Sequence, residues 1–254
     1  MYMLKSKQIL YLMFYLLLFC TVTNTYAQEQ NFSSGIKQNI LLELYTSEGC
    51  SSCPPADKWL SQLKQDKRLW KQIIPIAFHV DYWDYLGWQD RFASAAYSKR
   101  QRTYAQQGYA QSVYTPGFFS NGNEWRDFFH SRKLPSPISK SVGELHASLD
   151  APHLTVTYSP IQKTKDPLTL NIVMLGNDLI THVRQGENSG RKLKHDFVVL
   201  NHKTTKLNYT GEIYQWSGQI SKQTKFNNSK PAIAFWVSKN NDPLPIQVTG
   251  GWIR

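Results

Sequence analysis

Residues 40–53 read ILLELYTSEGCSSC, and this stretch decides the expected fold. Its first seven residues are apolar or favour extended structure, which predicts a strand over 40–46. Residues 57–64 repeat apolar side chains at helical spacing, which predicts an amphipathic helix. Cys50 and Cys53 therefore stand where a strand gives way to a helix, a layout typical of thioredoxin-like redox sites.

The start of a helix favours a reactive thiolate at Cys50. Free backbone N–H groups and the positive end of the helix dipole both stabilise the thiolate, and the thiolate is the form that attacks a disulfide. Pro54 and Pro55 bias the residues before them away from helical geometry. We therefore expect the helix to begin at Pro55, with both cysteines in the loop that leads to it.

The third cysteine, Cys20, lies in a segment with the features of a secretory signal. Lys5 and Lys7 form a basic region, residues 9–20 are apolar, and Ala27 precedes the expected cleavage site. The apolar run is shorter than the roughly 20 residues that span a bilayer. The mature chain is therefore expected to carry one CxxC motif in an oxidising compartment, the periplasm or the exterior.

The mature chain is basic, and its charge is uneven. Removal of 27 residues from the 254 leaves 227 with a net charge of +9, of which 28–150 carry +2 and 151–254 carry +7. Outside the cytoplasm such an excess favours anionic lipid, envelope polymers or acidic proteins, and no nucleic-acid partner is expected. No dense basic run is present, so a solvated surface is the simplest interpretation. Membrane contact is expected only through the signal peptide or this basic surface.

The first part of the mature chain alternates strand-like and helical runs. Residues 73–80 predict a second strand, and residues 91–107 predict a polar helix that ends at Gly108. The Asn-Gly pair at 121–122 predicts a tight hairpin. We therefore expect an α/β thioredoxin-like domain over residues 36–133.

The rest of the chain is expected to form a β-rich, sandwich-like C-terminal domain. After a signal peptide over 1–27 and the first domain, residues 134–150 read as a linker with one short helix near its end. Residues 151–254 contain short apolar runs separated by Asn, Gly, Pro and Ser, as in β-sandwiches. The expected strands are 154–158, 168–175, 197–200, 213–220, 232–237 and 246–249.

Other uses of the CxxC motif can be weighed. As a structural disulfide, the CxxC motif would close a four-residue loop and add only about 2 kcal/mol to the free energy of unfolding, against roughly 3 to 4.7 kcal/mol for long loops. A structural zinc site would need further ligands, and the sequence has no second CxxC motif or paired histidine to supply them. Haem attachment fails because Pro54 stands where the CxxCH motif requires histidine. Copper(I) remains open, because two thiolates form a soft site. We expect no cofactor and assign no metal ligand.

Two further positions complete the expected site. In thioredoxin-like folds a proline before a strand is cis and faces the CxxC motif, which predicts this role for Pro116, with the backbone of Thr115 pairing with substrate. Glu43 lies inside an apolar strand, where burial raises a carboxyl pKa. It is a candidate proton acceptor for Cys53, unless it simply points to solvent.

Three other features allow both a structural and a functional interpretation. The aromatic stretch 82–88 is either a lip that receives a partner or a packed loop. His79 is expected to be a buried histidine with its hydrogen bonds satisfied. Residues 186–190 predict a turn with positive φ at glycine.

Several segments of the chain resemble an exported bacterial family known as domain of unknown function 1223. The resemblance implies a thioredoxin-like N-terminal domain, an envelope location and no known reaction. Gly117 departs from it, since a larger polar residue is expected there. The matching segments are 43–57, 78–88, Arg100-Gln101 with Tyr104, 113–116, 186–191, Leu193 and His195-Asp196.

The sequence therefore predicts thiol–disulfide exchange with protein thiols or disulfides of the cell envelope. Cys50 would attack, a mixed disulfide would form, and Cys53 would resolve it. Two alternatives stay open: copper(I) binding or relay by the same cysteines, and a non-enzymatic binding module with an inert disulfide.

Overall fold

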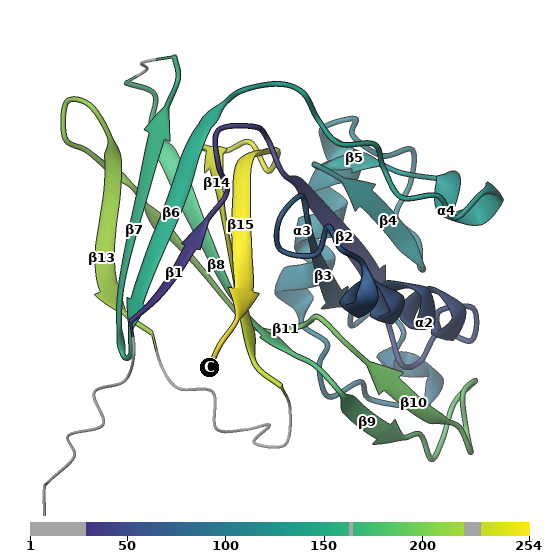
Figure 1. The fold of residues 1–254 in the computed structure, drawn as a ribbon. Coiled ribbons are helices and arrows are strands. Elements are labelled where there is room, and N and C mark those ends of the chain that lie inside the picture. Colours follow the sequence, from purple (N-terminus) through teal and green to yellow (C-terminus); the bar gives the residue numbers. More distant parts are fainter. Residues whose placement is uncertain (1–28, 163–164, 221–229) are drawn as a thin grey trace, which may run out of the picture.

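The computed structural model describes residues 29–162, 165–220 and 230–254 (Figure 1). The expected signal peptide, with Cys20, lies outside these residues. Strands make up 43% of the structure and helices 14%, arranged as an eight-stranded sheet, a five-stranded sheet and the β9–β10 pair. The expected α/β thioredoxin-like domain followed by a separate sandwich is therefore wrong, because sheets dominate the described residues.

The eight-stranded sheet takes strands from both halves of the chain. Its order is β15-β14-β8-β11-β3-β2-β4-β5. The halves meet where β3 and β11 run parallel, with Ala77 opposite Val198 and the Ala77 amide donating to the Phe197 carbonyl at 2.8 Å. Local patterns of hydrophobicity carry no information on this pairing. The strands are β2 (Ile40–Thr46), β3 (Ile73–His79), β4 (Gly117–Ser120), β5 (Asn123–Glu124), β8 (Leu168–Gly176), β11 (Val198–Lys206), β14 (Ala232–Lys239) and β15 (Pro245–Trp252).

The five-stranded sheet, in the order β1-β6-β7-β13-β12, packs against the β8, β14 and β15 end of the larger sheet (Figure 1). The shared core includes Phe32 from β1 and Phe235 from β14, whose ring centroids lie 5.8 Å apart. The strands are β1 (Gln30–Ser33), β6 (Gly143–Asp150), β7 (His153–Pro160), β12 (Asn208–Tyr209) and β13 (Tyr214–Gln219).

Strand β6 replaces the short helix expected near the end of the 134–150 linker. Its buried side chains alternate along the chain, at Leu145, Ala147 and Leu149. A period of two is the pattern of a strand with one buried face. The expected helix is therefore wrong, because the apolar residues recur at every second position and not at helical spacing.

The helices cover both faces of the sheet around β2. Helix α2 (Pro54–Gln62) and the short η1 (Leu63–Gln65) pack on one face, and α3 (Ala95–Gln106) on the other. Helix α2 begins at Pro54, one residue earlier than expected, because Cys53 adopts helical geometry with φ −78° and ψ −35°. No helix in the described part of the chain is long and apolar enough to cross a membrane.

Many of the expected elements are confirmed. Strand β2 has the expected limits, β3 ends one residue early, and β4 and β5 form the hairpin across Asn121 and Gly122. Helix α3 begins later than expected, after Ser94, whose hydroxyl accepts from the Ala96 amide. The elements that the sequence did not predict include β1, β12, β9 (Leu179–His182), β10 (Lys192–His195), η2 (Asp84–Leu86) and α4 (Asp127–His130).

A buried ion pair ties β2 to α3. Arg100 donates from Nε and Nη2 to the two carboxylate oxygens of Glu43, each at 2.9 Å. The hydroxyls of Tyr45 and Tyr104 donate to the same carboxylate at 2.9 and 2.6 Å. The Glu43 side chain has no exposed surface, so its charge depends on these four donors.

We expect Arg100→Met to lower the free energy of unfolding by about 3–5 kcal/mol, because it leaves a buried carboxylate without its cation. The double variant Arg100→Met/Glu43→Leu should recover part of this loss, since the unpaired charge is then removed. Urea denaturation measures both. Arg102→Met, at an exposed position on the same helix, is the control and should change stability by less than about 0.5 kcal/mol. An equal loss in the single and double variants would contradict the explanation.

Candidate functional site

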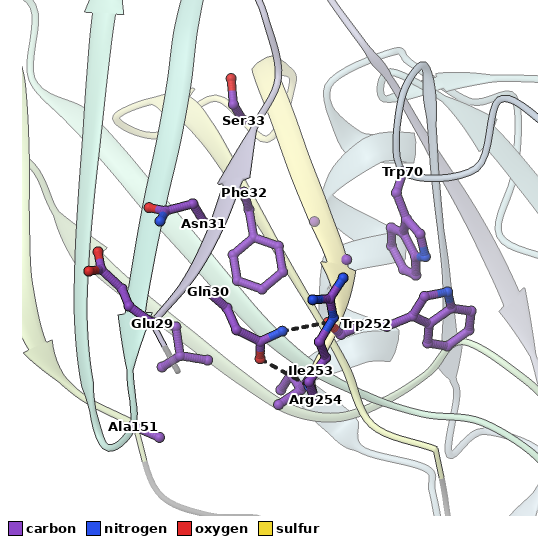
Figure 2. Close-up of a pocket in the computed structure, with 13 residues that line it drawn as sticks. Glu29, Gln30, Asn31, Phe32, Ser33, Trp70, Ala151, Trp252, Ile253 and Arg254 are labelled. Carbon is purple, nitrogen blue, oxygen red and sulfur yellow. Dashed lines mark hydrogen bonds between the residues drawn. The ribbon is translucent and has the colours of Figure 1, made fainter. Parts of the chain in front are cut away.

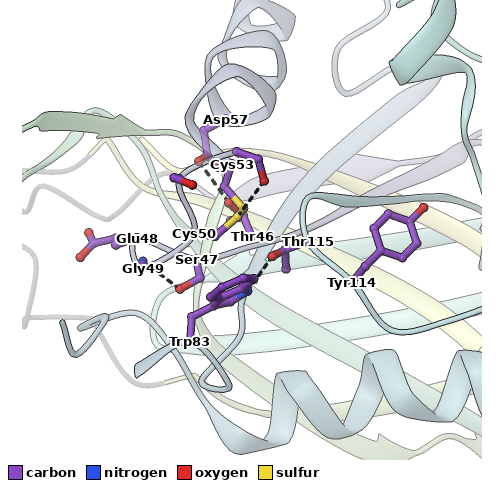
Figure 3. Close-up of a disulfide and its surroundings, with 12 residues drawn as sticks. Thr46, Ser47, Glu48, Gly49, Cys50, Cys53, Asp57, Trp83, Tyr114 and Thr115 are labelled. Carbon is purple, nitrogen blue, oxygen red and sulfur yellow. Dashed lines mark hydrogen bonds between the residues drawn. A yellow bond between two sulfur atoms is a disulfide. The ribbon is translucent and has the colours of Figure 1, made fainter. Parts of the chain in front are cut away.

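Cys50 and Cys53 form a disulfide at the start of α2 (Figure 3). Strand β2 ends at Thr46, and a short turn carries the chain to Cys53, the N-cap of α2. The Asp57 amide donates to the Cys53 carbonyl at 3.1 Å, which closes the first helical turn. The disulfide thus lies at the positive end of the helix dipole.

Both cysteines are fully buried, whereas Ser51 and Ser52 between them are exposed. The Ser52 hydroxyl lies 3.4 Å from Cys50 Sγ. Disulfide exchange needs direct contact between an attacking thiolate and a sulfur atom. A partner can therefore reach this disulfide only if neighbouring groups move.

The turn between β9 and β10 holds the cysteine loop. Asn188 is buried, and its Nδ2 donates to the carbonyls of Glu48 at 2.8 Å and Cys50 at 2.9 Å. The Ser51 amide donates to Glu187 Oε2 at 3.1 Å. The expected positive φ in this turn is confirmed, since both of its glycines have φ near +75°.

Thr115 and Trp83 lie on one side of the disulfide (Figure 3). The Trp83 indole N–H donates to the Thr115 hydroxyl at 2.7 Å. A Cβ added to Gly49 would lie 3.1 Å from Trp83 Cβ, so this glycine allows the loop to approach the tryptophan. The bond between Thr115 and Pro116 is cis, as expected.

The aromatic stretch 82–88 is for the most part a packed loop. Tyr82 donates to Gln101 Oε1 at 3.0 Å, and Trp88 donates to Glu48 Oε2 at 2.8 Å. Tyr85 is the exception, with 79% of its surface exposed. Of the two interpretations of this stretch, the structure favours packing over an open lip.

Glu43 lies on the opposite face of β2 from the cysteine site, which corrects its expected role. Successive side chains of a strand point to opposite faces. Leu42 and Leu44 pack in the core that contains α2, whereas Glu43 faces α3 and binds Arg100. Its carboxylate is engaged by four hydrogen bonds, so it cannot accept a proton from Cys53.

A second group of reactive side chains is buried beside the first turn of α2. Asp57 on α2, His79 at the end of β3 and His195 at the end of β10 bring potential ligand atoms within 4.8 Å of one another. All three are buried. The Thr46 hydroxyl donates to Asp57 Oδ2 at 3.1 Å, which fixes the orientation of this carboxylate.

Charge inside this group shifts the titration of its members. Burial by itself lowers the pKa of His79, but the negative charge of Asp90 and the hydrogen bond from His79 Nδ1 to Asp90 Oδ2, at 2.6 Å, raise this pKa to about 9. Burial raises the pKa of Asp57, although the nearby His195 opposes this. His79 is buried as expected, but among the described residues only its Nδ1 has a hydrogen-bond partner and its Nε2 has none.

The sequence did not predict this group, because its members come from distant parts of the chain. Asp57 and His195 are 138 positions apart, and neither forms a short-range ligand motif. The one sequence feature that these three residues share is that each lies in a segment that resembles the family. Sequence spacing alone cannot bring such residues together.

A cavity of about 600 Å³ lies elsewhere, between β1 and the end of β15 (Figure 2). Gln30, Phe32, Trp70 and Trp252 are among the residues that line it. Neither the cysteines nor the buried histidines reach it. The chemistry of the cysteine site is thus not located in this cavity.

Two solved structures share the fold at low sequence identity. A protein of Agrobacterium tumefaciens, AGR_C_4864, is 19% identical with a TM-score of 0.59, and the match covers 84% of this chain and 93% of that one. HBP35 of Porphyromonas gingivalis is 15% identical with a TM-score of 0.56, covering 86% of this chain and 76% of that one. No curated protein matches the chain.

The family resemblance is confirmed over most of the sequence. Residues 41–238 match the family described as protein of unknown function, DUF1223, and the chain belongs to this family.

Proposed function

We propose that the protein exchanges its Cys50–Cys53 disulfide with the thiols or disulfides of a partner protein. The observation that carries the proposal is the position of the disulfide at the first turn of a nine-residue helix, where Cys53 is the N-cap. Reduction would release a thiolate close to the positive end of the helix dipole, which lowers the pKa of a thiol and makes it reactive at neutral pH.

A structural role explains this disulfide less well. The closed loop spans only four residues, and such a loop contributes about 2 kcal/mol in the chain-entropy treatment. The neighbouring segments are already joined by the buried side chain of Asn188 and by the hydrogen bond from Trp83 to Thr115. The fold around the site thus has other connections that would persist after reduction.

The exchange can be written with its electrons and protons balanced. In the reduced chain, the Cys50 thiolate attacks a partner disulfide, which forms a mixed disulfide and releases one partner thiolate. The Cys53 thiolate then attacks Cys50 Sγ and releases the second. The chain is left with its disulfide, and the partner gains two electrons and, after protonation, two thiols. The reverse sequence transfers a disulfide to a partner with two thiols.

The burial of both sulfur atoms adds a requirement for opening. The exposed Ser51 and Ser52 form the surface that a partner meets first. Displacement of the 186–190 turn or of Trp83 would then uncover Cys50. We propose an oxidising compartment, the periplasm or the exterior, as the place where the protein works, because disulfides form and persist there.

The reduction potential of the disulfide is the central test. We expect a value between about −270 and −120 mV, the range of known exchange catalysts, measured by equilibration in glutathione buffers with mass-resolved thiol labelling. Cys50→Ser should abolish exchange with a disulfide-bonded test protein. Cys53→Ser should accumulate the mixed disulfide, because the resolving thiol is missing.

Other outcomes separate the alternatives. A potential below about −300 mV is that of a structural disulfide and would support the inert binding module. One copper(I) ion bound per reduced chain, with no exchange activity, would instead support copper handling by the two thiolates. Ser61→Ala, on the same helix and away from the sulfur atoms, is the control and should exchange like the natural chain.

We expect Asn188→Ala to accelerate reduction of the disulfide by dithiothreitol roughly 10- to 30-fold. The variant removes two hydrogen bonds of about 1 kcal/mol each from the closed cysteine loop, and every 1.4 kcal/mol changes the population of the open loop about tenfold. Stopped-flow mixing under excess reductant measures the rate. Ser189→Ala removes a hydroxyl that donates to the Arg184 carbonyl at 3.0 Å and is the neighbouring control. Equal rates in both variants would show that the turn does not limit access.

A further inference from the structure

We propose that Asp57, His79 and His195 form a buried binding site for a divalent transition-metal ion. The site is separate from the disulfide and does not depend on its exchange activity. It would make this chain a metalloprotein with a nitrogen and oxygen ligand set, a property that neither its cysteines nor its family assigns.

The donor set is that of a transition-metal site. Two imidazoles and one carboxylate converge from α2, β3 and β10, and their potential ligand atoms lie within 4.8 Å of one another. His195 Nδ1 lies 3.9 Å from Asp57 Oδ2. Tetrahedral zinc, with bonds of about 2.0–2.1 Å, places its ligand atoms about 3.3 Å apart. The three ligand atoms, which lie up to 4.8 Å apart, would therefore move closer together when they bind one ion.

The free nitrogen atoms of the two histidines indicate which atoms bind. His79 uses Nδ1 toward Asp90, and its Nε2 is buried without a hydrogen-bond partner. Both nitrogens of His195 are likewise buried and without a partner. A buried polar group left without a partner is costly. Coordination of a cation by His79 Nε2 and His195 Nδ1 satisfies these atoms.

A carboxylate lies close to each of the two histidines, as is usual in metal sites. A metal-bound histidine usually donates its other N–H to a carboxylate or carbonyl, which fixes its tautomer and orientation. Asp90 has this position for His79, at 2.6 Å. Glu48 Oε1 lies 3.4 Å from His195 Nε2, and Trp88 holds the other Glu48 oxygen. His79 therefore has a hydrogen-bonded supporting carboxylate, and Glu48 lies close enough to His195 Nε2 to take the same role once the ring turns toward an ion.

Charge balance also favours a cation. The carboxyl groups of Glu48, Asp57 and Asp90 are all buried around the two histidines. Buried charges are normally paired or bound to a metal ion. Lys64, on the short η1 that follows α2, is already bound to Asp178 and Asp196. Asp90 is already paired with His79, so a divalent cation between the histidines would balance the carboxylates of Glu48 and Asp57.

The ligand chemistry selects the class of ion. Imidazole suits zinc, copper, iron and nickel, whereas magnesium and calcium prefer oxygen ligands alone. Two histidines and one aspartate supply three protein ligands, which leaves a fourth position for water or another small ligand, as in catalytic zinc sites. Zinc is thus the appropriate probe.

The test is zinc binding by the chelator-treated, oxidised protein. We expect one zinc ion per chain in competition with a chromophoric chelator, and an X-ray absorption spectrum with only nitrogen and oxygen ligands at about 2.0–2.2 Å. The double variant Cys50→Ser/Cys53→Ser should bind zinc equally well. Equal binding would show that no thiolate binds the zinc ion, so the zinc result does not depend on whether the disulfide exchanges.

Matched substitutions make the test specific. His195→Gln and Asp57→Asn should weaken binding more than about 100-fold, and Asp90→Asn about 10- to 100-fold. His182→Ala, an exposed histidine on the strand that pairs with β10, should bind like the natural chain. Near-ultraviolet circular dichroism confirms that each variant is folded. Absence of zinc from the natural chain, sulfur ligation, or undiminished binding by folded Asp57→Asn would overturn the proposal.

Discussion

The parallel pairing of β3 with β11 is the constraint on which the rest of the structure depends. It joins two parts of the chain more than a hundred residues apart into one sheet, through Ala77 and Val198. Just before β11, Phe197 has a φ of +59°, and the preceding strand β10 lies outside the sheet, where it pairs with β9 and packs against α2. His195 at the end of β10 thereby reaches His79, with ring centroids 5.0 Å apart. Without the pairing of β3 with β11, neither the support for the cysteine loop nor the buried histidine pair would exist.

The same few residues support both chemical groups. Glu48 offers its carbonyl to Asn188, which steadies the cysteine loop, and directs its carboxylate toward His195. Cys53 and Asp57 are joined by a backbone hydrogen bond across the first turn of α2. A change in the sulfur chemistry and a change in the buried histidine group would therefore act on the same turn. The two groups are chemically distinct but share this turn, so each is best measured while the other is held constant.

Local chemistry was predictable from the sequence, whereas long-range assembly was not. Strand β2, the hairpin after β4 and the positive φ in the 186–190 turn follow from hydrophobic patterns and glycine geometry, which act within a few residues. The expected fold class is wrong because alternating strands and helices indicate an α/β domain within residues 36–133, whereas β3 pairs with a strand from the other half of the chain. The position of Glu43 inside the apolar strand that leads to the cysteines predicts a place in the cysteine site, but its side chain points to the other face of β2. His79 could be recognised as buried, but its partners on α2 and β10 could not.

The burial of the cysteine site has a consequence for selectivity. An exposed disulfide reacts with any thiol at a rate that the thiol's own chemistry determines. Here the sulfur atoms are enclosed, and Trp83, Thr115 and Asn188 must give way before contact. A small thiol forms few new interactions, so it cannot offset the free energy needed to open these contacts. A partner protein could compensate for it by binding the exposed Ser51–Ser52 surface. If the proposed exchange takes place, enclosure would favour a protein that recognises this face over free small thiols.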